Sequence, residues 1–248
     1  MPDRAERAIA CAIEMQNAMV RVNEENRLQG LPEIEMGIGL NEDEVIVGNI
    51  GSSKRSKYGV VGSGVNMTSR IESYSVGGQI LISDSVRNKA GEILRIDEQR
   101  EVIPKGADAP LKIYEVGGIG APYNLALEEK DPSLVALERR VPLLYTALDG
   151  KDVGKDQLKG LVSRLSKKGA EIELEEPLEL LTNIKMNLRD VPEELASKDF
   201  YGKVIECTGK DDHKCIVRFT SASPEVAAYF QALRQYGAKG MALSRYKP

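Results

Sequence analysis

The sequence predicts a mixed α+β protein in two parts, and three observations support this prediction. The chain opens with an amphipathic helical pattern, which gives way to runs where apolar residues alternate with polar or small ones. Beyond residue 138 come short strand-like runs separated by turn residues, a pattern typical of a small antiparallel β-barrel or sandwich. Ser223-Pro224-Glu225 then predicts the start of a C-terminal helix. With 248 residues, the chain is long enough for one large domain or two ordinary ones.

The first part is expected to combine helices with strands. Residues 3–28 are predicted to form a helix, because apolar residues recur there at spacings of three to four. The period changes to two in residues 33–40, and residues 44–50 read as a second strand, so this pair is predicted to form a hairpin. A polar loop is expected at 51–57. Further strands are expected at 58–61, 79–83, 93–103 and 111–117, and further helices at 65–73 and, after a Ser83 cap, at 84–91.

The second part is expected to contain six strands and one helix. The strand-like runs cover residues 142–148, 157–165, 169–175, 183–188, 201–207 and 214–219. The apolar stripe of the helix consists of Val226, Tyr229, Phe230 and Leu233. Because the pattern breaks near residues 118–124, we expect a first domain at 1–120, a linker at 121–138 and a second domain at 139–248.

Composition and charge narrow the possible functions. The net charge is −4 and no long run of Lys or Arg occurs, so nucleic acid is not expected as a partner. No apolar run approaches the roughly 18 residues that a membrane span needs, and the N-terminus lacks the pattern of a secretory signal. Three cysteines do not make a disulfide framework, and a single histidine argues against a multi-histidine zinc site. We therefore expect a cytoplasmic protein with reduced thiols.

The most informative pattern combines glycines, cations and a helix start. Asn66 and Arg70 are four apart on a predicted helix and therefore share a face. Arginine offers a permanently charged fork for phosphate oxygens, and asparagine offers a donor and an acceptor on a short stem. Gly62 lets the backbone approach a ligand, and the preceding loop adds the positive charges of Lys54 and Arg55. This pattern predicts a surface that faces a polyphosphate; the alternative is a solvated helix with one Asn and one Arg.

The stretch GIGLNEDEVIVGNIGSSKRSKYGVVGSGVNMTSRIES resembles the C-terminal half of a class III adenylate/guanylate cyclase catalytic domain. The shared motifs are a VGNIGS-type loop, a Y-x-V-x-G strand and V-N-x-x-x-R on a helix, in that order. The downstream segments GGQILIS and VIPKGADAPLKIYEVGGI resemble the family as well. The resemblance covers about residues 1–118 and implies part of a ferredoxin-like cyclase fold. It also implies formation of a cyclic nucleotide from ATP or GTP, the lyase reaction of a second-messenger pathway.

The resemblance assigns roles to individual residues. Asn66 matches the asparagine that positions the ribose or substrate, and Arg70 matches the arginine that stabilises negative charge on the reacting phosphates. Gly59 stands where many members carry an Asp or Thr that contacts the purine edge, so base selectivity is not implied. Together with Gly59, the residues Lys54, Arg55 and Gly62 are expected to line the substrate site. Asp43 replaces the usual glycine of the family's hairpin turn.

The family's two metal-binding aspartates, which hold Mg²⁺ or Mn²⁺, would precede the first residue of this chain. Asp3 lies near that end, and its context does not match a metal-ligand motif. We therefore expect no metal ligand in this chain and no catalysis by the chain alone. It is expected to be either a truncated gene model of a cyclase or a cyclase-like regulatory and dimerisation module. Because family sites form between subunits, a homodimer, or complementation of an intact partner, is expected.

Residues 139–236 resemble a PilZ-type six-stranded barrel with a C-terminal helix. Such domains bind cyclic di-GMP through an Arg-x-x-x-Arg arm and a (D/N)-x-S-x-x-G motif. The matching residues are Arg139, Arg140, Ser166 and Gly169. Two departures weaken the match: Arg164 occupies the acidic or amide position, and the second Arg of the arm is absent. A degenerate cyclic di-GMP sensor and a barrel used only for contacts both remain open.

Cys207 and Cys215 flank the turn GKDDHK and can face each other across a hairpin. With His213 they suggest a metal or redox pair. The alternative is that both are small, partly buried apolar residues, because the spacing is not a known metal-ligand pattern.

Overall fold

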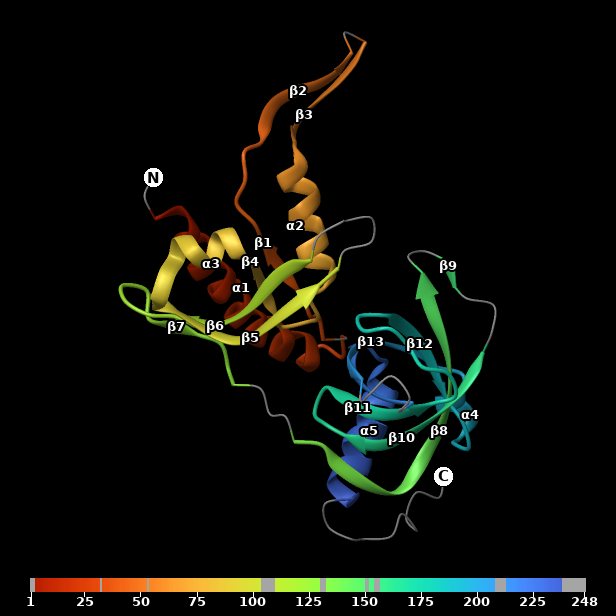
Figure 1. Cartoon of the computed structure of the whole chain (residues 1–248). Coiled ribbons are helices and arrows are strands. Elements are labelled where there is room, and N and C mark those ends of the chain that lie inside the picture. Colours follow the sequence, from red (N-terminus) through yellow and green to blue (C-terminus); the bar gives the residue numbers. More distant parts are fainter. Residues whose placement is uncertain are drawn as a thin grey trace. The chain divides into compact units, whose positions relative to one another are not determined.

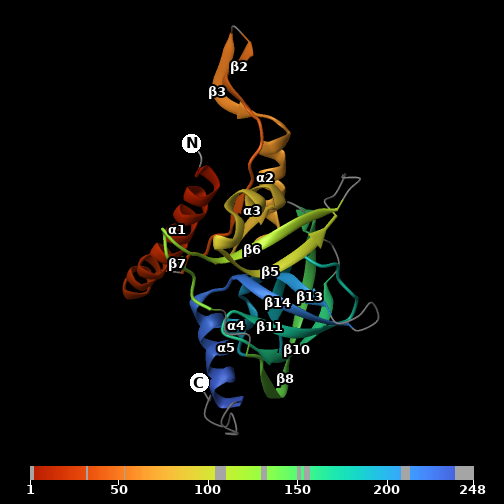
Figure 2. The same ribbon diagram turned by 60° about the vertical axis from the view of Figure 1, so that its left-hand side comes forward.

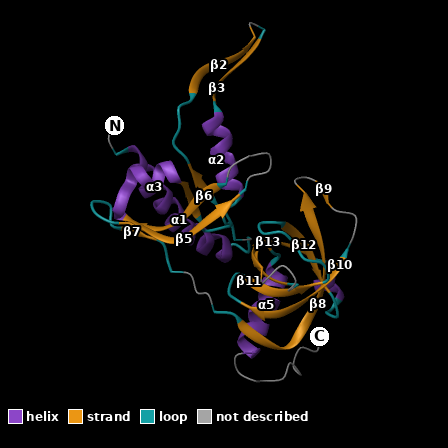
Figure 3. Cartoon of the chain, in the orientation of Figure 1, coloured by secondary structure: helices purple, strands orange, loops and turns teal. Residues whose placement is uncertain are grey.

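The structure is a computed structural model that describes residues 3–31, 33–52, 54–103, 110–129, 133–149, 152–153, 157–207 and 213–237. These residues form two compact units, one within Met1–Glu129 and the other within Lys130–Pro248 (Figure 1). Helices and strands mix in the first unit, whereas strands dominate the second (Figure 3). The predicted α+β class is confirmed, with a first unit of helices and strands followed by a small antiparallel barrel.

The first unit is built on a sheet with one parallel pair. The strands lie in the order β1 (Ile38–Leu40), β4 (Ile80–Ser83), β6 (Leu111–Ile119) and β5 (Leu94–Val102), with β7 (Leu125–Ala126) paired to β6. β1 and β4 run parallel, and the other neighbours are antiparallel. A parallel pair needs a long connection, and here residues 41–79 supply it.

Two helices share one core with this sheet. α1 (Arg4–Leu28) covers nearly the predicted range, and its residues Ile9 and Ile13 are fully buried. They pack in a cluster with Ile80 and Ile82 of β4 and with residues of α3 (Asp84–Ala90). As predicted, Ser83 caps α3, because its Oγ accepts a hydrogen bond from the backbone N–H of Val86. A short 3₁₀ turn, η1 (Gly91–Ile93), follows.

The predicted hairpin between residues 33–40 and 44–50 is wrong. β1 pairs with β4 instead, because this parallel pairing places Ile38 and Leu40 against the core. The hairpin that forms consists of β2 (Ile46–Ser52) and β3 (Arg55–Val61), so strand continues into much of the expected polar loop at 51–57. Figures 1 and 2 show that this hairpin extends away from the rest of its unit.

The second unit is a closed six-stranded barrel. Its strands follow one another as β10 (Leu158–Leu165), β11 (Gly169–Leu174), β14 (Lys214–Ser221), β13 (Asp199–Cys207), β12 (Asn183–Leu188) and β8 (Val135–Asp149). Pairing between β10 and β8 closes the ring. The short β9 (Asp152–Val153) pairs with β8, and α4 (Glu193–Ala196) lies between β12 and β13. All six predicted strand runs are present.

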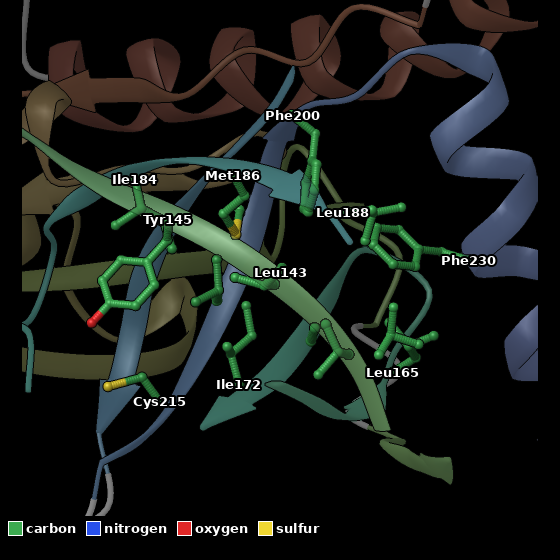
Figure 4. Packing of buried hydrophobic residues seen from close by; sticks show 14 of the residues in the cluster. Leu143, Tyr145, Leu165, Ile172, Ile184, Met186, Leu188, Phe200, Cys215 and Phe230 are labelled. Atoms are coloured by element: carbon green, nitrogen blue, oxygen red, sulfur yellow. The ribbon is translucent and has the colours of Figure 1, made fainter. Parts of the chain in front are cut away.

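The barrel interior is filled by apolar side chains from every strand (Figure 4). The helix α5 (Pro224–Gly237) contributes Val226, Phe230 and Leu233 to the core, as its predicted stripe requires. The ring of Phe230 meets that of Phe200 edge-on, with 5.4 Å between the ring centroids. Burial of these large side chains is the main term that stabilises the barrel.

The first unit continues beyond the expected boundary at residue 120. β7 lies inside the expected linker, yet it pairs with β6, and Leu125 and Leu127 pack against the core of the first unit. The barrel begins with β8 at Val135. Among the described helices, none has the length and apolar character that crossing a membrane requires.

Candidate nucleotide-binding site

The helix α2 (Ser63–Ser73) carries the two residues expected to act on the substrate, and two glycines set its position. A Cβ at Gly39 of β1 would lie 2.6 Å from the backbone nitrogen of Glu72 in α2. A Cβ at Gly37 would overlap Ser75, two residues beyond the end of the helix. Both glycines therefore let the helix approach β1 more closely than any larger residue would allow.

Asn66 and Arg70 lie four residues apart on α2 and share one of its faces, as the sequence predicts. Asn66 is exposed and Arg70 is partly exposed. Within the described part of the chain, neither side chain makes a hydrogen bond or ion pair. The charge of Arg70 acts on Tyr74: burial raises the pKa of that phenol, and the nearby guanidinium works against the rise. Both side chains are therefore free to meet a ligand.

The start of α2 adds partly positive backbone groups to this surface. Gly62 is the N-cap residue with φ at +155°, a conformation that side chains rarely adopt, and no side chain caps the helix. The first N–H groups of a helix attract anions. Asp43 packs on this turn, since a Cβ at Gly64 would lie 2.4 Å from the Cβ of Asp43. Asp43, which replaces the usual glycine of the family's hairpin turn, therefore lies directly against the start of α2.

Lys54 and Arg55 are not brought to Asn66 and Arg70 within this chain. Arg55 pairs with Ser52 at the tip of the hairpin, whereas Val61 pairs with Ile46 at its base, next to α2. Six residues of extended strand separate the two ends, or roughly 20 Å. Gly59 lies between them opposite Gly48, and a Cβ there would meet only Ile50, at 3.7 Å. Of the expected substrate-binding residues, Gly62 is thus the one that adjoins α2.

Sequence reasoning missed the exposed apolar surface of this hairpin. Tyr58 is 76% exposed and Ile46 is 71% exposed. Val45, Val47, Ile50, Val60 and Val61 are exposed as well. The signal was present in the two apolar runs on either side of the polar tip. Their exposure becomes evident only when the hairpin is seen to leave the sheet. Exposed apolar side chains gathered on one hairpin are typical of an interaction site.

The metal half of a cyclase site does not fit the residues at hand. Among the described residues, no group of three or more His, Cys, Asp or Glu side chains lies close enough to hold a metal ion. Near the N-terminus, Glu42 is engaged by Arg4 and Lys89 instead. The hydrogen bond from Lys89 is the main cause that lowers the pKa of Glu42.

In the barrel, the structure gathers Ser166 and Gly169 at one turn. The Oγ and the N–H of Ser166 both donate to the carbonyl oxygen of Gly169, at 3.2 and 2.9 Å. Arg139 and Arg140 lie on the neighbouring β8, where pairing with β10 skips from Ala136 to Val141. The two arginines therefore occupy a bulge, a feature that re-aims side chains.

Two ion pairs restrict this region. The guanidinium of Arg140 binds the carboxylate of Glu173. Arg164, at the position where the PilZ motif has an acid or amide, lies 3.6 Å from Glu171. Arg139 is exposed, and its charge opposes the burial that raises the pKa of Tyr229. Arg140 is thus already paired, with a residue at the opposite end of β11 from Gly169.

A cavity of about 880 Å³ opens elsewhere on the barrel. Its lining includes Lys159, Arg189, Asp190 and His213, along with apolar residues of β8 and β10. The predicted cyclic di-GMP residues do not line it, although Glu173, the partner of Arg140, does. Sequence reasoning noted His213 but not the cavity, because five segments that are distant in the sequence build it.

The comparisons with known proteins agree with the two units. Residues 1–118 match the model of the adenylate and guanylate cyclase catalytic domain, and residues 138–236 match the PilZ domain. The adenylate cyclase of Anabaena cylindrica is 38% identical over 120 residues, which are 44% of this chain and 24% of that protein. Adenylate cyclase 1 of Rhizobium meliloti (strain 1021) is 30% identical over 122 residues, 48% of this chain and 18% of that protein.

One solved structure adds to this comparison. The crystal structure of the guanylyl cyclase Cya2 is 52% identical, covers 52% of this chain and 65% of that chain, and has a TM-score of 0.49. The chain spans a quarter or less of the length of the two adenylate cyclases. Residues 1–118 are similar to the adenylate and guanylate cyclase catalytic domain, and residues 138–236 are similar to the PilZ domain.

Proposed function

We propose that the first unit supplies one half of a nucleotide-cyclising site, with Asn66 and Arg70 acting on ATP or GTP. The observation that carries this proposal is their shared, unpaired face on α2, beside an uncapped helix start. In the reaction, the 3′-hydroxyl attacks the α-phosphate and pyrophosphate leaves. Arg70 stabilises the negative charge that develops on the phosphate oxygens, and Asn66 orients the ribose. Gly59 has no side chain with which to read the base.

The other half of the site comes, in this proposal, from a partner chain. The cyclase family generally depends on Mg²⁺ or Mn²⁺, and the described residues offer no cluster for such an ion. The exposed apolar hairpin β2–β3 is the surface that would bind the partner. A homodimer could form through the same surface, but only a cyclase that carries the metal ligands would complete the site. Such a chain is inactive alone and contributes to catalysis only when paired.

Complementation tests this proposal. The chain is mixed with a cyclase that keeps its metal-binding aspartates but carries Ala in place of its own Asn and Arg. Cyclic nucleotide should form from ATP or GTP only in the mixture. A hydrogen bond to a charged group contributes about 1.5–3 kcal/mol, so Arg70→Ala should reduce the rate about 10- to 100-fold. Asn66→Ala should reduce it in the same direction.

The matched control is Arg21→Ala, which removes an exposed cation from α1 and should leave the rate unchanged. Association of the two chains is measured in parallel by sedimentation. A mixture that associates but forms no cyclic nucleotide would contradict the proposal. Activity that survives Arg70→Ala would contradict the role given to that residue.

We propose, as a second function, that the barrel binds cyclic di-GMP and thereby regulates the first unit. The support is the resemblance to the PilZ motif of Ser166 and Gly169, which meet at one turn, and of Arg139 and Arg140, which lie in the β8 bulge. Binding requires Arg140 to exchange Glu173 for a phosphate, which costs part of the binding free energy. We therefore expect weak affinity.

Isothermal titration with cyclic di-GMP tests the second function. The parent should release or absorb heat, whereas Arg140→Ala and Ser166→Ala should not at the same concentrations. Arg189→Ala is the control, because Arg189 lines the separate cavity. If the parent chain gives no heat of binding, the second function is contradicted, and the barrel is then a module used only for contacts. Loss of heat with Arg189→Ala alone would move the ligand to the cavity.

A further inference from the structure

Two cysteines face each other across the last hairpin of the barrel. Cys207 ends β13, Cys215 lies near the start of β14, and the two are direct partners in the antiparallel register. Direct partners have their Cα atoms about 4.5 or 5.5 Å apart, depending on the type of pair. Both values lie within the span of about 4.4–6.8 Å that a disulfide allows. The backbone therefore already has the geometry that a bridge needs.

The side chains also point to the same place. Cys215 is 2% exposed and belongs to the barrel core, and Cys207 packs against that core while remaining partly exposed. The thiol of Cys207 donates to the carbonyl oxygen of Leu178 at 3.5 Å. Figure 4 shows the Cys215 sulfur near the hydroxyl end of Tyr145. Both thiols are free.

The two thiols differ in their access to an oxidant. The pKa of Cys215 is raised to about 12. Burial is the largest cause of this rise, and the hydrogen bond with the Cys207 side chain is the second. Cys215 therefore stays protonated and shielded, and a thiol of this kind reacts slowly with oxidants. Cys207, which solvent reaches, is the thiol that an oxidant meets first. This asymmetry is typical of a pair with one attacked and one resolving cysteine.

We infer that Cys207 and Cys215 form a redox-sensitive pair that closes to a disulfide when a hydroperoxide oxidises the barrel. The thiol of Cys207 loses its proton, the thiolate attacks the peroxide and the O–O bond breaks. Cys207 becomes a sulfenic acid, and the leaving hydroxide takes up that proton and departs as water (as an alcohol when the oxidant is an alkyl hydroperoxide). The sulfur of Cys215 then displaces the sulfenic hydroxyl, and its proton leaves with that hydroxyl as a second water. Two thiols are oxidised and one hydroperoxide is reduced. A dithiol reductant reverses the reaction by thiol–disulfide exchange.

The bridge would fix the end of the hairpin on which two cavity residues lie. His213 and Lys214 immediately precede Cys215, and both line the barrel cavity. A bridge between direct strand partners constrains the unfolded chain and leaves the native register in place. The oxidised barrel should therefore unfold at a higher temperature than the reduced one.

Thiol counting on the full chain tests the inference. The reduced protein has three thiols that a maleimide labels after denaturation. After treatment with hydrogen peroxide and removal of the excess, only one should remain, and peptide mapping should join Cys207 to Cys215. Treatment with dithiothreitol should restore all three thiols. The melting temperature should rise on oxidation and fall back on reduction.

Two variants separate the pair from other cysteine chemistry. Cys11→Ala removes the exposed cysteine of α1 and should still lose two thiols on oxidation. Cys207→Ala should lose no pair and show no redox-dependent melting temperature. The inference fails if the parent forms only chains linked through Cys11. It also fails if Cys207 proceeds to a sulfinic acid while Cys215 remains labelled.

Discussion

At the scale of single residues, the candidate site depends on glycines that let α2 approach β1 as well as on the side chains that α2 carries. The shared helix face of Asn66 and Arg70 could be predicted from their spacing alone, because side chains four residues apart lie on one face of a helix. The need for Gly39 could not, since it arises from a contact with Glu72, which is far along the chain. The separation of Arg55 from Arg70 could not be predicted either, because it depends on the register of the β2–β3 hairpin.

Gly39→Ala should destabilise the first unit and displace α2. The added Cβ would lie 2.6 and 2.7 Å from backbone atoms of Glu72, and backbone cannot rotate away as a flexible side chain can. Overpacking of this kind costs about 1–3 kcal/mol. Hydrogen exchange along a urea series, read from peptides of α1 and β4, measures the loss of stability in that unit.

Gly48→Ala is the matched control, because it lies in a strand of the same unit and its Cβ would meet no atom within 4 Å. It should shift the unfolding midpoint little. Equal midpoints for the two variants would show that α2 has room to move away from β1. The close approach would then not be what positions Asn66 and Arg70.

At the scale of elements, local pattern predicted the strands better than their partners. The six barrel runs and α5 could be read from alternation and from a proline at the first helical position. The hairpin at 33–50 was mispredicted because sequence neighbours were paired by default. Ile38 packs against the core by pairing with Ile80, more than 40 residues away. Local periodicity carries no information about that distant partner.

The long strand β8 makes the same point for the barrel. Only residues 142–148 were predicted, yet the strand begins at Val135. Its first half pairs with β10 and its second half with β12, which closes the ring. Closure of the barrel removes exposed strand edges. The need to pair on both sides therefore makes β8 longer than its own sequence pattern predicts.

At the scale of the whole molecule, the two units are similar to two different families. Each has its own apolar core, and the match to one family ends before the match to the other begins. The composition could exclude nucleic acid as an expected partner, but it could not indicate an assembly. The exposed apolar residues of the hairpin lead us to expect one, because apolar surface exposed to water favours association.

Substitution of the hairpin should therefore change the mass of the particle in solution. We expect the chain to self-associate, and Ile46→Asp to weaken association at least tenfold, because a charge would be buried against apolar groups. Sedimentation equilibrium over a range of concentrations measures the dissociation constant. Val20→Asp, at an exposed apolar position of α1, is the control and should leave the constant unchanged. A parent chain that stays monomeric throughout would contradict a homodimer, and equal weakening by both substitutions would place the contact outside the hairpin.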